Sequence, residues 1–303
     1  MTELSQKIFN EFQIRKTKKQ KDAFIALLQS HFPEIKIQQG RFPNYKNLVL
    51  GDVDTAKVVL TAHYDTCARM LLPNFITPKN PILSILYSLV ILIPLLVIVF
   101  ALGMLLGYLQ IPQALARWIF LIVYFLFLYL MIAGPANPNT ANDNTSGVIA
   151  LCELYACLEP AQRRKIAIVL FDLEESGLIG STSFRKQYKK QMKEKLLINF
   201  DCVGDGDTMM LSVSKAAREK YTQLIDDSFL PTDNKTVMLC KAEKIYYPSD
   251  QMGFRESVAV AALKHKPLLG YYMDRIHTKR DTQLDKENIK LLCEGTLNLI
   301  KKL

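Results

Sequence analysis

A histidine and an aspartate two residues apart, His63 and Asp65, directly follow the apolar run VVLTA at 58–62. Such a β-branched run predicts a buried strand, and ligands of open α/β sheets bind at the carboxyl ends of the strands. An imidazole at such a place can bind a metal ion through one nitrogen, while a nearby carboxylate holds the other nitrogen and fixes the tautomer. The pair alone is a weak signal, because this spacing is common by chance.

More carboxylates and a second histidine lie just past other predicted elements or in the loops beside them. The set is Asp143, Glu174, Glu175, Asp201 and His277. Imidazole and carboxylate together are the ligands that zinc and similar cations take. With one carboxylate bridging, five protein ligands can hold two ions, and the remaining glutamate is free to act as a base.

The adjacent pair Glu174 and Glu175 is the most informative part of this set. If both were ligands, the site would lack a proton acceptor, whereas one ligand beside one base gives what metal-assisted hydrolysis needs. The alternative is an acidic start to a helix, where carboxylates stabilise the positive end of the helix dipole. We favour the metal site because the pair occurs together with the other ligand candidates in a consistent order.

Alternating strands and helices would position these side chains. Strands are predicted at 58–62, 166–171, 196–200 and 236–241, with shorter β segments near 35–38 and 47–50. Helices are predicted over 1–32, with an interruption at the basic run 15–19, and over 148–158, 178–195, 214–229 and 285–302. This alternation predicts an α/β fold, namely a three-layer αβα sandwich with a mixed central sheet.

A long apolar insertion separates the two halves of the predicted site. No charged residue occurs between 80 and 116, and Arg117 is the only charge before a second apolar run that ends near 134. Both runs are long enough to span a bilayer, so we predict a transmembrane hairpin of about 82–108 and 117–134. The soluble domain is then discontinuous, 1–81 and 135–303, with 82–134 inserted. The alternative is a helical hairpin buried in a soluble core.

Charge and cysteine usage bear on partners and compartment. Lys plus Arg number 38 against 29 Asp plus Glu, but no zinc-finger spacing, RNA-binding motif or basic leucine-zipper pattern occurs, so we expect no nucleic-acid partner. The far turn of the hairpin carries only Arg117, while nearly all lysines lie in the soluble domain. The positive-inside tendency therefore predicts a multi-pass membrane protein whose catalytic domain is cytoplasmic. The six scattered cysteines agree with a reducing compartment.

Six ordered motifs in the soluble part resemble those of the M28 zinc peptidases, the aminopeptidase Y/S-like family with a co-catalytic pair of zinc ions. They are HYD at 63–65, ANDNTSGV at 141–148, FDLEESGLIGS at 171–181, NFD at 199–201, SDQMGF at 249–254 and IHTKRDT at 276–282. The resemblance covers about 45–81 and 135–303. It implies a mixed-sheet zinc-peptidase fold interrupted by the hairpin.

The resemblance also implies a ligand for each metal position. Asp143 would bridge two Zn²⁺ ions, with Glu175 and His277 on one ion and His63 and Asp201 on the other. Cobalt and manganese remain alternatives to zinc. In the family, the peptide bond that follows the bridging aspartate is often cis.

The same resemblance implies catalytic roles. Glu174 would be the general base, passing a proton from the attacking water to the leaving amine, and Asp65 would orient His63. Tyr246, three residues before Ser249, is a candidate oxyanion stabiliser. One motif departs from the family pattern, because Gln251 stands where the family has a histidine.

The implied activity is that of an aminopeptidase, acting on a peptide or aminoacyl substrate with a free N-terminus. Since the hairpin is inserted between two parts of the site, the substrate is further expected to come from the lipid bilayer. Two alternatives stay open: a single-zinc acyltransferase like the glutaminyl cyclases, which share the fold, and a non-catalytic scaffold with a peptidase fold.

Overall fold

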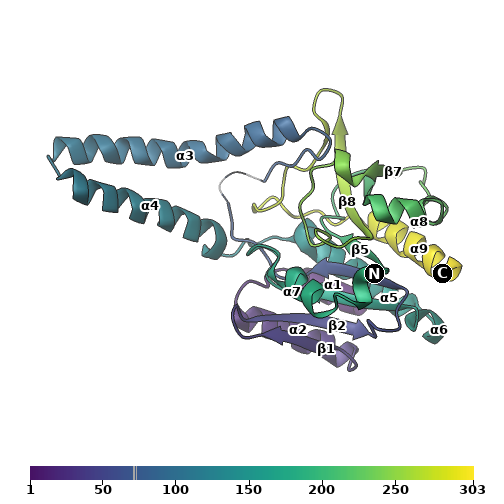
Figure 1. The fold of residues 1–303 in the computed structure, drawn as a ribbon. Coiled ribbons are helices and arrows are strands. Elements are labelled where there is room, and N and C mark those ends of the chain that lie inside the picture. The colour runs from purple at the N-terminus through teal and green to yellow at the C-terminus, as the bar shows by residue number, and fades with distance from the viewer. Residues whose placement is uncertain (71, 73) are drawn as a thin grey trace.

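A mixed nine-stranded sheet forms the centre of the α/β domain (Figure 1). The computed structural model describes residues 1–70, 72 and 74–303. The main path of the sheet runs β1-β2-β4-β3-β5-β8-β6-β7, and β9 pairs with β8. The strands are β1 Lys36–Gly40, β2 Tyr45–Gly51, β3 Val58–His63, β4 Ile166–Phe171, β5 Leu196–Phe200, β6 Thr208–Val213, β7 Thr236–Lys241, β8 Ser257–Lys266 and β9 Gly270–Tyr272.

Helices cover the sheet and form the projecting hairpin. They are α1 Glu3–Glu11, α2 Lys18–His31, α3 Pro81–Tyr108, α4 Gln113–Ala133, α5 Gly147–Cys157, α6 Pro160–Arg163, α7 Ile179–Gln187, α8 Lys215–Asp226 and α9 Lys286–Lys302. Short helical turns occur at η1 Ala141–Ser146, η2 Gln191–Lys193 and η3 Ala242–Lys244.

Alternate side chains of the strands enter cores on opposite faces of the sheet, because successive strand residues point to opposite sides. On one face, Leu60 and Ile168 pack in the cluster that includes α1, α2, α5, α8 and α9. On the other face, Val59 and Val169 pack with Phe184 of α7. The predicted three-layer αβα sandwich is confirmed, although loops share the second face with α7.

The helical segment predicted over 1–32 divides into α1 and α2, and the break at 12–17 overlaps the basic run that was expected to interrupt it. Thr17 caps the start of α2 with a capping box. Its side chain accepts from the Gln20 backbone N–H, and the Gln20 side chain accepts from the Thr17 backbone N–H. The predicted helix to 195 ends at Gln187. Strand β6 was not predicted from the sequence.

Arg15 lies in the break between α1 and α2 and is fully buried. Its guanidinium donates to the carbonyls of Tyr64 and Phe12 and to Thr145 Oγ1. It also lies 5.2 Å from the centre of the Phe24 ring. The N-terminal segment is therefore joined by this side chain to the end of β3 and to η1.

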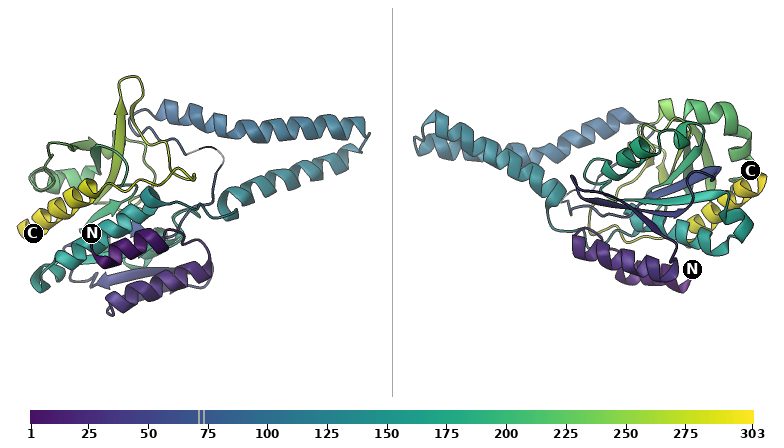
Figure 2. Two further views of the ribbon diagram at one scale, coloured as in Figure 1. Left: turned by 180° about the vertical axis from the view of Figure 1, so that it is seen from behind. Right: turned by 60° about the horizontal axis from the view of Figure 1, so that its bottom comes forward.

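The hairpin of α3 and α4 projects away from the domain in every view (Figures 1 and 2). Only 11% of the most apolar window of α3 and none of that of α4 is buried, so the alternative of a hairpin inside a soluble core is wrong. Both helices are long and apolar enough to cross a membrane. The second one starts at Gln113 and not at 117, so Arg117 lies within it.

Replacing Arg15 with methionine should destabilise the domain by about 2–4 kcal/mol, because the carbonyls of Tyr64 and Phe12 would lose a buried, charged donor. Urea unfolding of the detergent-solubilised chain measures the effect. The control is Lys18→Met, whose side chain is 76% exposed and should change the free energy of unfolding by less than about 0.5 kcal/mol. Equal effects of the two substitutions would contradict the structural role of Arg15.

Candidate metal centre

Three adjacent parallel strands deliver the predicted site residues to one edge of the sheet. Strand β3 lies between β4 and β5 and is parallel to both. His63 is the last residue of β3, Glu174 and Glu175 follow β4, and Asp201 comes directly after β5. Because parallel strands end at the same edge, residues separated by more than a hundred positions in the chain meet there.

Asp143 lies between the two histidines of the site. One of its carboxylate oxygens is 3.2 Å from Nε2 of His63, and the other is 3.0 Å from Nε2 of His277. Asp143 belongs to η1, and its peptide bond to Asn144 is cis. A carboxylate with one oxygen toward each imidazole has the arrangement of a ligand shared by two cations.

Each histidine also has a carboxylate of its own. Nε2 of His63 lies 3.5 Å from Oδ1 of Asp201, and Nε2 of His277 lies 3.5 Å from Oε2 of Glu175. The structure thus brings all five predicted ligands together, in two groups that share Asp143. Their function as ligands remains a prediction.

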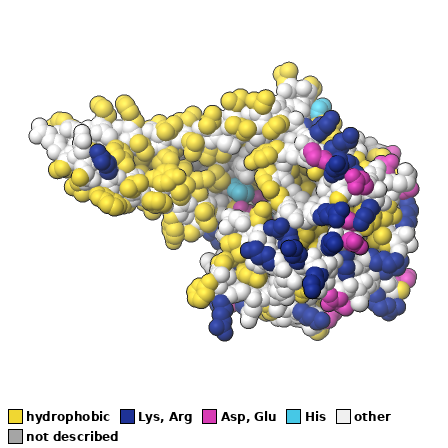
Figure 3. All heavy atoms as spheres, in the orientation of Figure 1, with side chains coloured by type: hydrophobic (Ala, Val, Ile, Leu, Met, Phe, Trp, Pro, Cys, Tyr) yellow, Lys and Arg dark blue, Asp and Glu magenta, His cyan; other side chains and the backbone are white. Residues whose placement is uncertain are grey.

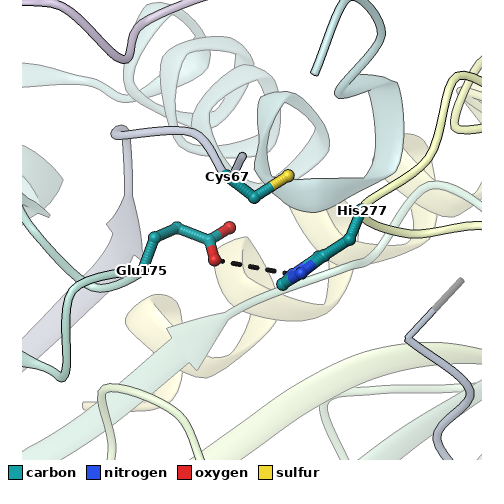
Figure 4. A group of neighbouring side chains, drawn as sticks. All are labelled: Cys67, Glu175 and His277. Atoms are coloured by element: carbon teal, nitrogen blue, oxygen red, sulfur yellow. Dashed lines mark ion pairs between the residues drawn. The ribbon is translucent and has the colours of Figure 1, made fainter. Parts of the chain in front are cut away.

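Cys67 is a neighbour of the second group that the sequence did not reveal. Its sulfur, a carboxylate oxygen of Glu175 and a ring nitrogen of His277 all lie within 4.8 Å of one another (Figure 4). The general-base candidate Glu174 forms a similar group with His63 and Glu175. Cys67 lies only two residues after Asp65, but a lone cysteine in the sequence gives no signal of its own.

The side chains fit a bound cation. Oδ1 of Asp201 and Oε1 of Glu175 are buried and have no hydrogen-bond partner in the part of the chain that the structure describes. Buried carboxylates of this kind are costly unless they are paired or bind a metal ion. A pair of divalent cations among these carboxylates and neutral imidazoles would satisfy the unpaired oxygens.

The pKa values of the ionisable side chains at the site are shifted because these side chains are buried close together. Burial raises the pKa of Glu175 to about 8 and that of Glu174 well above its ordinary value. Burial would also raise the pKa of Asp143, but hydrogen bonds from His277 and His63 hold it below the usual range. Burial lowers the pKa of His277, but nearby Glu175 and Asp143 outweigh it and raise the value to about 9. Burial and the neighbouring carboxylates and imidazoles therefore shift the pKa of each of these groups.

Asp65 acts mainly on the backbone of the glutamate pair. Its two carboxylate oxygens accept the backbone N–H groups of Glu174, at 3.0 Å, and Glu175, at 3.2 Å. Nδ1 of His63 is 3.1 Å from the Asp65 backbone oxygen and 3.6 Å from its carboxylate. Asp65 thus adjoins His63, mainly through its backbone oxygen, and its role in orienting His63 stays a prediction. Its carboxylate also fixes the position of Glu174 and Glu175, which the sequence did not indicate.

Other polar residues hold the remaining ligands in place. Asp281 accepts the backbone N–H groups of Asn142, at 2.7 Å, and Asp143, at 3.0 Å. Ser249 donates to Asp201 at 2.6 Å and accepts from Asn199 at 3.0 Å. These contacts hold the carboxylates in position, as the outer hydrogen-bond partners of a metal centre do.

Three residues at the site have left-handed backbone conformations. They are Leu173, directly before Glu174, Cys202, directly after Asp201, and His277 itself. Non-glycine residues rarely adopt positive φ, and they do so mostly where surrounding contacts impose it at functional sites. The backbone therefore takes this uncommon conformation next to Glu174, next to Asp201 and at His277.

Two predicted details lie at the margin of the site. Tyr246 is 55% exposed, and its backbone N–H donates to the Pro78 carbonyl. Its role as an oxyanion stabiliser stays a prediction. Gln251, at the departing motif position, accepts from Asn199 and donates to the Tyr247 carbonyl, so it has a structural role in the loop.

Comparisons with known proteins agree with this arrangement. The family model described as "Peptidase family M28" matches residues 129–298. The aminopeptidase LapA of Legionella pneumophila is 15% identical with a TM-score of 0.57, covering 99% of this chain and 69% of that one. A Zn-dependent exopeptidase from Parabacteroides distasonis is 14% identical with a TM-score of 0.57, covering 98% and 94%. A glutaminyl cyclase from Porphyromonas gingivalis is 16% identical with a TM-score of 0.56, covering 99% and 96%. At these identities the structures show a shared fold.

Replacing Asp281 with asparagine should weaken metal binding by about 10- to 100-fold, because one of the two backbone bonds that fix Asp143 loses its acceptor. Competition with a chromophoric chelator measures the zinc affinity directly, without an activity assay. Asp226→Asn, an exposed change on α8, is the matched control. An unchanged affinity in the Asp281 variant would show that the turn around Asp143 does not depend on this carboxylate.

Proposed function

Because the chain belongs to peptidase family M28, we propose that it is a membrane-anchored aminopeptidase that uses two zinc ions to remove residues from a free peptide N-terminus. The observation that carries the proposal is Asp143, with one oxygen toward His63 and the other toward His277. A single-metal site does not need a carboxylate that is shared in this way.

The proposed ligands divide between two positions. His63 and Asp201 would hold one ion, His277 and Glu175 the other, and Asp143 both. Bound zinc supplies Lewis acidity toward a substrate carbonyl and lowers the pKa of water. Cys67 adjoins the His277 position and is a further donor there.

Glu174 is the group that would move the proton. Glu174 lies beside His63 and Glu175 but belongs to neither group of proposed ligands that shares Asp143, so it is free to act as a base. Burial raises its pKa, which favours its holding the proton taken from water until the leaving amine receives it. The Asp65 carboxylate keeps the Glu174 backbone in place during this exchange.

The hairpin would be the membrane anchor. Exposed apolar side chains continue along α3 and α4, whereas Arg117 is the only charged residue in either helix. All basic residues except Arg117 lie outside the hairpin, so the positive-inside tendency favours a cytoplasmic domain. A membrane location also explains why such apolar helices have no protein covering in the described chain.

A glutaminyl-cyclase-like acyltransferase is the second candidate, favoured by the close match in length to the Porphyromonas gingivalis protein. It differs in two measurable ways. It needs one zinc ion, and it cyclises an N-terminal glutamine and does not release an amino acid. A non-catalytic scaffold would do neither.

Replacing Glu174 with glutamine should lower kcat on aminoacyl-naphthylamides by about 10²- to 10⁴-fold, because the proton acceptor is lost while the ligands remain. The purified chain should still contain two zinc ions, measured by elemental analysis. Glu219→Gln, an exposed change on α8, should leave both the rate and the metal content unchanged.

An N-acetylated peptide and a glutaminyl peptide complete this test. Release of the first residue only from free N-termini supports an aminopeptidase. One zinc ion with conversion of the glutaminyl peptide to pyroglutamate would establish the cyclase. Full metal content without either activity would favour the scaffold.

A further inference from the structure

The root of α4 is bonded to the segments that carry the metal centre. The Arg69 N–H donates to the Pro135 carbonyl at 2.8 Å, and the Asn137 N–H donates to the Cys67 carbonyl at 3.1 Å. The Met70 N–H donates to the His277 carbonyl at 2.8 Å. The residues that follow α4 are therefore hydrogen-bonded to the segment that carries Cys67, and that segment is hydrogen-bonded to His277.

The root of α3 lies on the segment just before His277. Ile76 and Met273 exchange backbone hydrogen bonds, at 3.1 and 2.8 Å. The Phe75 ring contacts Tyr87 of α3 and Tyr272 of β9, with ring centres 5.1 and 5.8 Å apart. Both helices of the hairpin are thus fixed to the polypeptide around one metal position.

The site is open on the side where the hairpin begins. Figure 3 shows a histidine and acidic side chains in a hollow where the apolar surface of the hairpin meets the domain. Of the two site histidines, the side chain of His277 is 18% exposed and that of His63 only 1%. A substrate therefore reaches the site past His277, next to the roots of α3 and α4.

The surface around these roots changes from apolar to basic. Ile82, Ile85 and Leu86 in the first turns of α3 are exposed, as are Tyr129 and Ile132 near the end of α4. The exposed basic residues beside the roots are Arg69, Lys79, Lys279 and Arg280. An apolar surface followed by a basic one matches the layers of a bilayer, with acyl chains along the helices and anionic headgroups at the domain.

We infer that the hairpin holds the metal centre at the bilayer surface, and that the substrate is an amphipathic or lipid-anchored peptide whose free N-terminus enters from the membrane. This inference rests on the proposed aminopeptidase function and names its substrate class. Confinement to the same membrane raises the effective concentration of such a peptide at the site. A soluble peptide of equal sequence gains nothing from the hairpin.

A membrane-anchored peptide reaches the site only if its spacer spans the distance between the membrane surface and the site. A site at the surface is within reach of a short spacer of about four extended residues, which spans roughly 14 Å. A cleft held far above the membrane would require a much longer spacer, on the order of twenty residues.

The test uses the full chain in vesicles of phosphatidylcholine and phosphatidylglycerol. Peptides with one N-terminal sequence carry a C-terminal hexadecyl group after a short or a long spacer, or no anchor. We expect kcat/KM for the short-spacer peptide to exceed that of the soluble peptide by about tenfold or more. When the bulk concentration of an anchored peptide is constant, the rate should also rise with the mole fraction of the peptide in the vesicle surface.

A pair of insertion variants tests whether the preference for the short spacer depends on the position of the domain relative to the membrane. About ten Gly and Ser residues placed between Asn80 and Pro81, and again between Gly134 and Pro135, would lift the domain off the membrane. The control carries the same insertion between Gln110 and Ile111, in the far turn. We expect the root variant to lose the preference for the short spacer while keeping the activity on the soluble peptide, and the turn variant to keep both.

The outcomes distinguish this inference from the proposed function. Equal kcat/KM for soluble and anchored peptides, or cleavage only after the long spacer, would overturn the inference and leave the aminopeptidase intact. Failure to cleave any of the peptides would overturn the aminopeptidase itself. If the root variant is inactive on the soluble peptide, the spacer series in the unmodified chain decides.

Discussion

The site depends on the pair of close contacts that Asp143 makes with His63 and His277. These histidines are far apart in the chain, one at the end of β3 and one in the loop after β9. Asp143 faces both because η1 carries it across the ends of β3 and β5, and Asp281 holds its backbone from the His277 side. Without this shared carboxylate, the two groups of ligands would be separate sites with different spacing.

The buried charges near this carboxylate need compensation from the protein as well as from a metal. Arg15 is buried near Asp65 and Asp143, which favour its charged form, while burial lowers its pKa to about 10. It adds one positive charge below the site and bonds the N-terminal segment to the carbonyl of Tyr64, next to His63. Folding of the first helices and assembly of the metal centre are thereby coupled, because both use the same guanidinium.

Much of the fold and of the site could be predicted because the signals are local. The buried strand 166–171 is a continuous apolar run, and His63, Glu175 and Asp201 lie at or shortly after the ends of predicted strands. Asp143 and His277 lie in loops, where only the resemblance of their motifs indicated them. Arg15 could not be predicted, because it lies in a basic run typical of a surface, and its partners come from distant segments. Strand β6 has no strong alternation, and it is fixed by pairing with β7 and β8. The contribution of Asp281 needs the turn at Asn142, which no spacing in the sequence reveals.

The same contacts explain how the domain accommodates an insertion in the middle of its site. Ala68 and Ala136 form an antiparallel bridge, so the two chain segments meet before the hairpin begins. This bridge closes the loop independently of its length, and closing a longer loop costs little additional entropy once its ends are held. The predicted ligands on either side, His63 and Asp143, are therefore separated from the packing of the hairpin. The backbone hydrogen bonds at its roots still set its direction, so in the proposed membrane location a shift of the hairpin would change access to the site while these side chains stay in place.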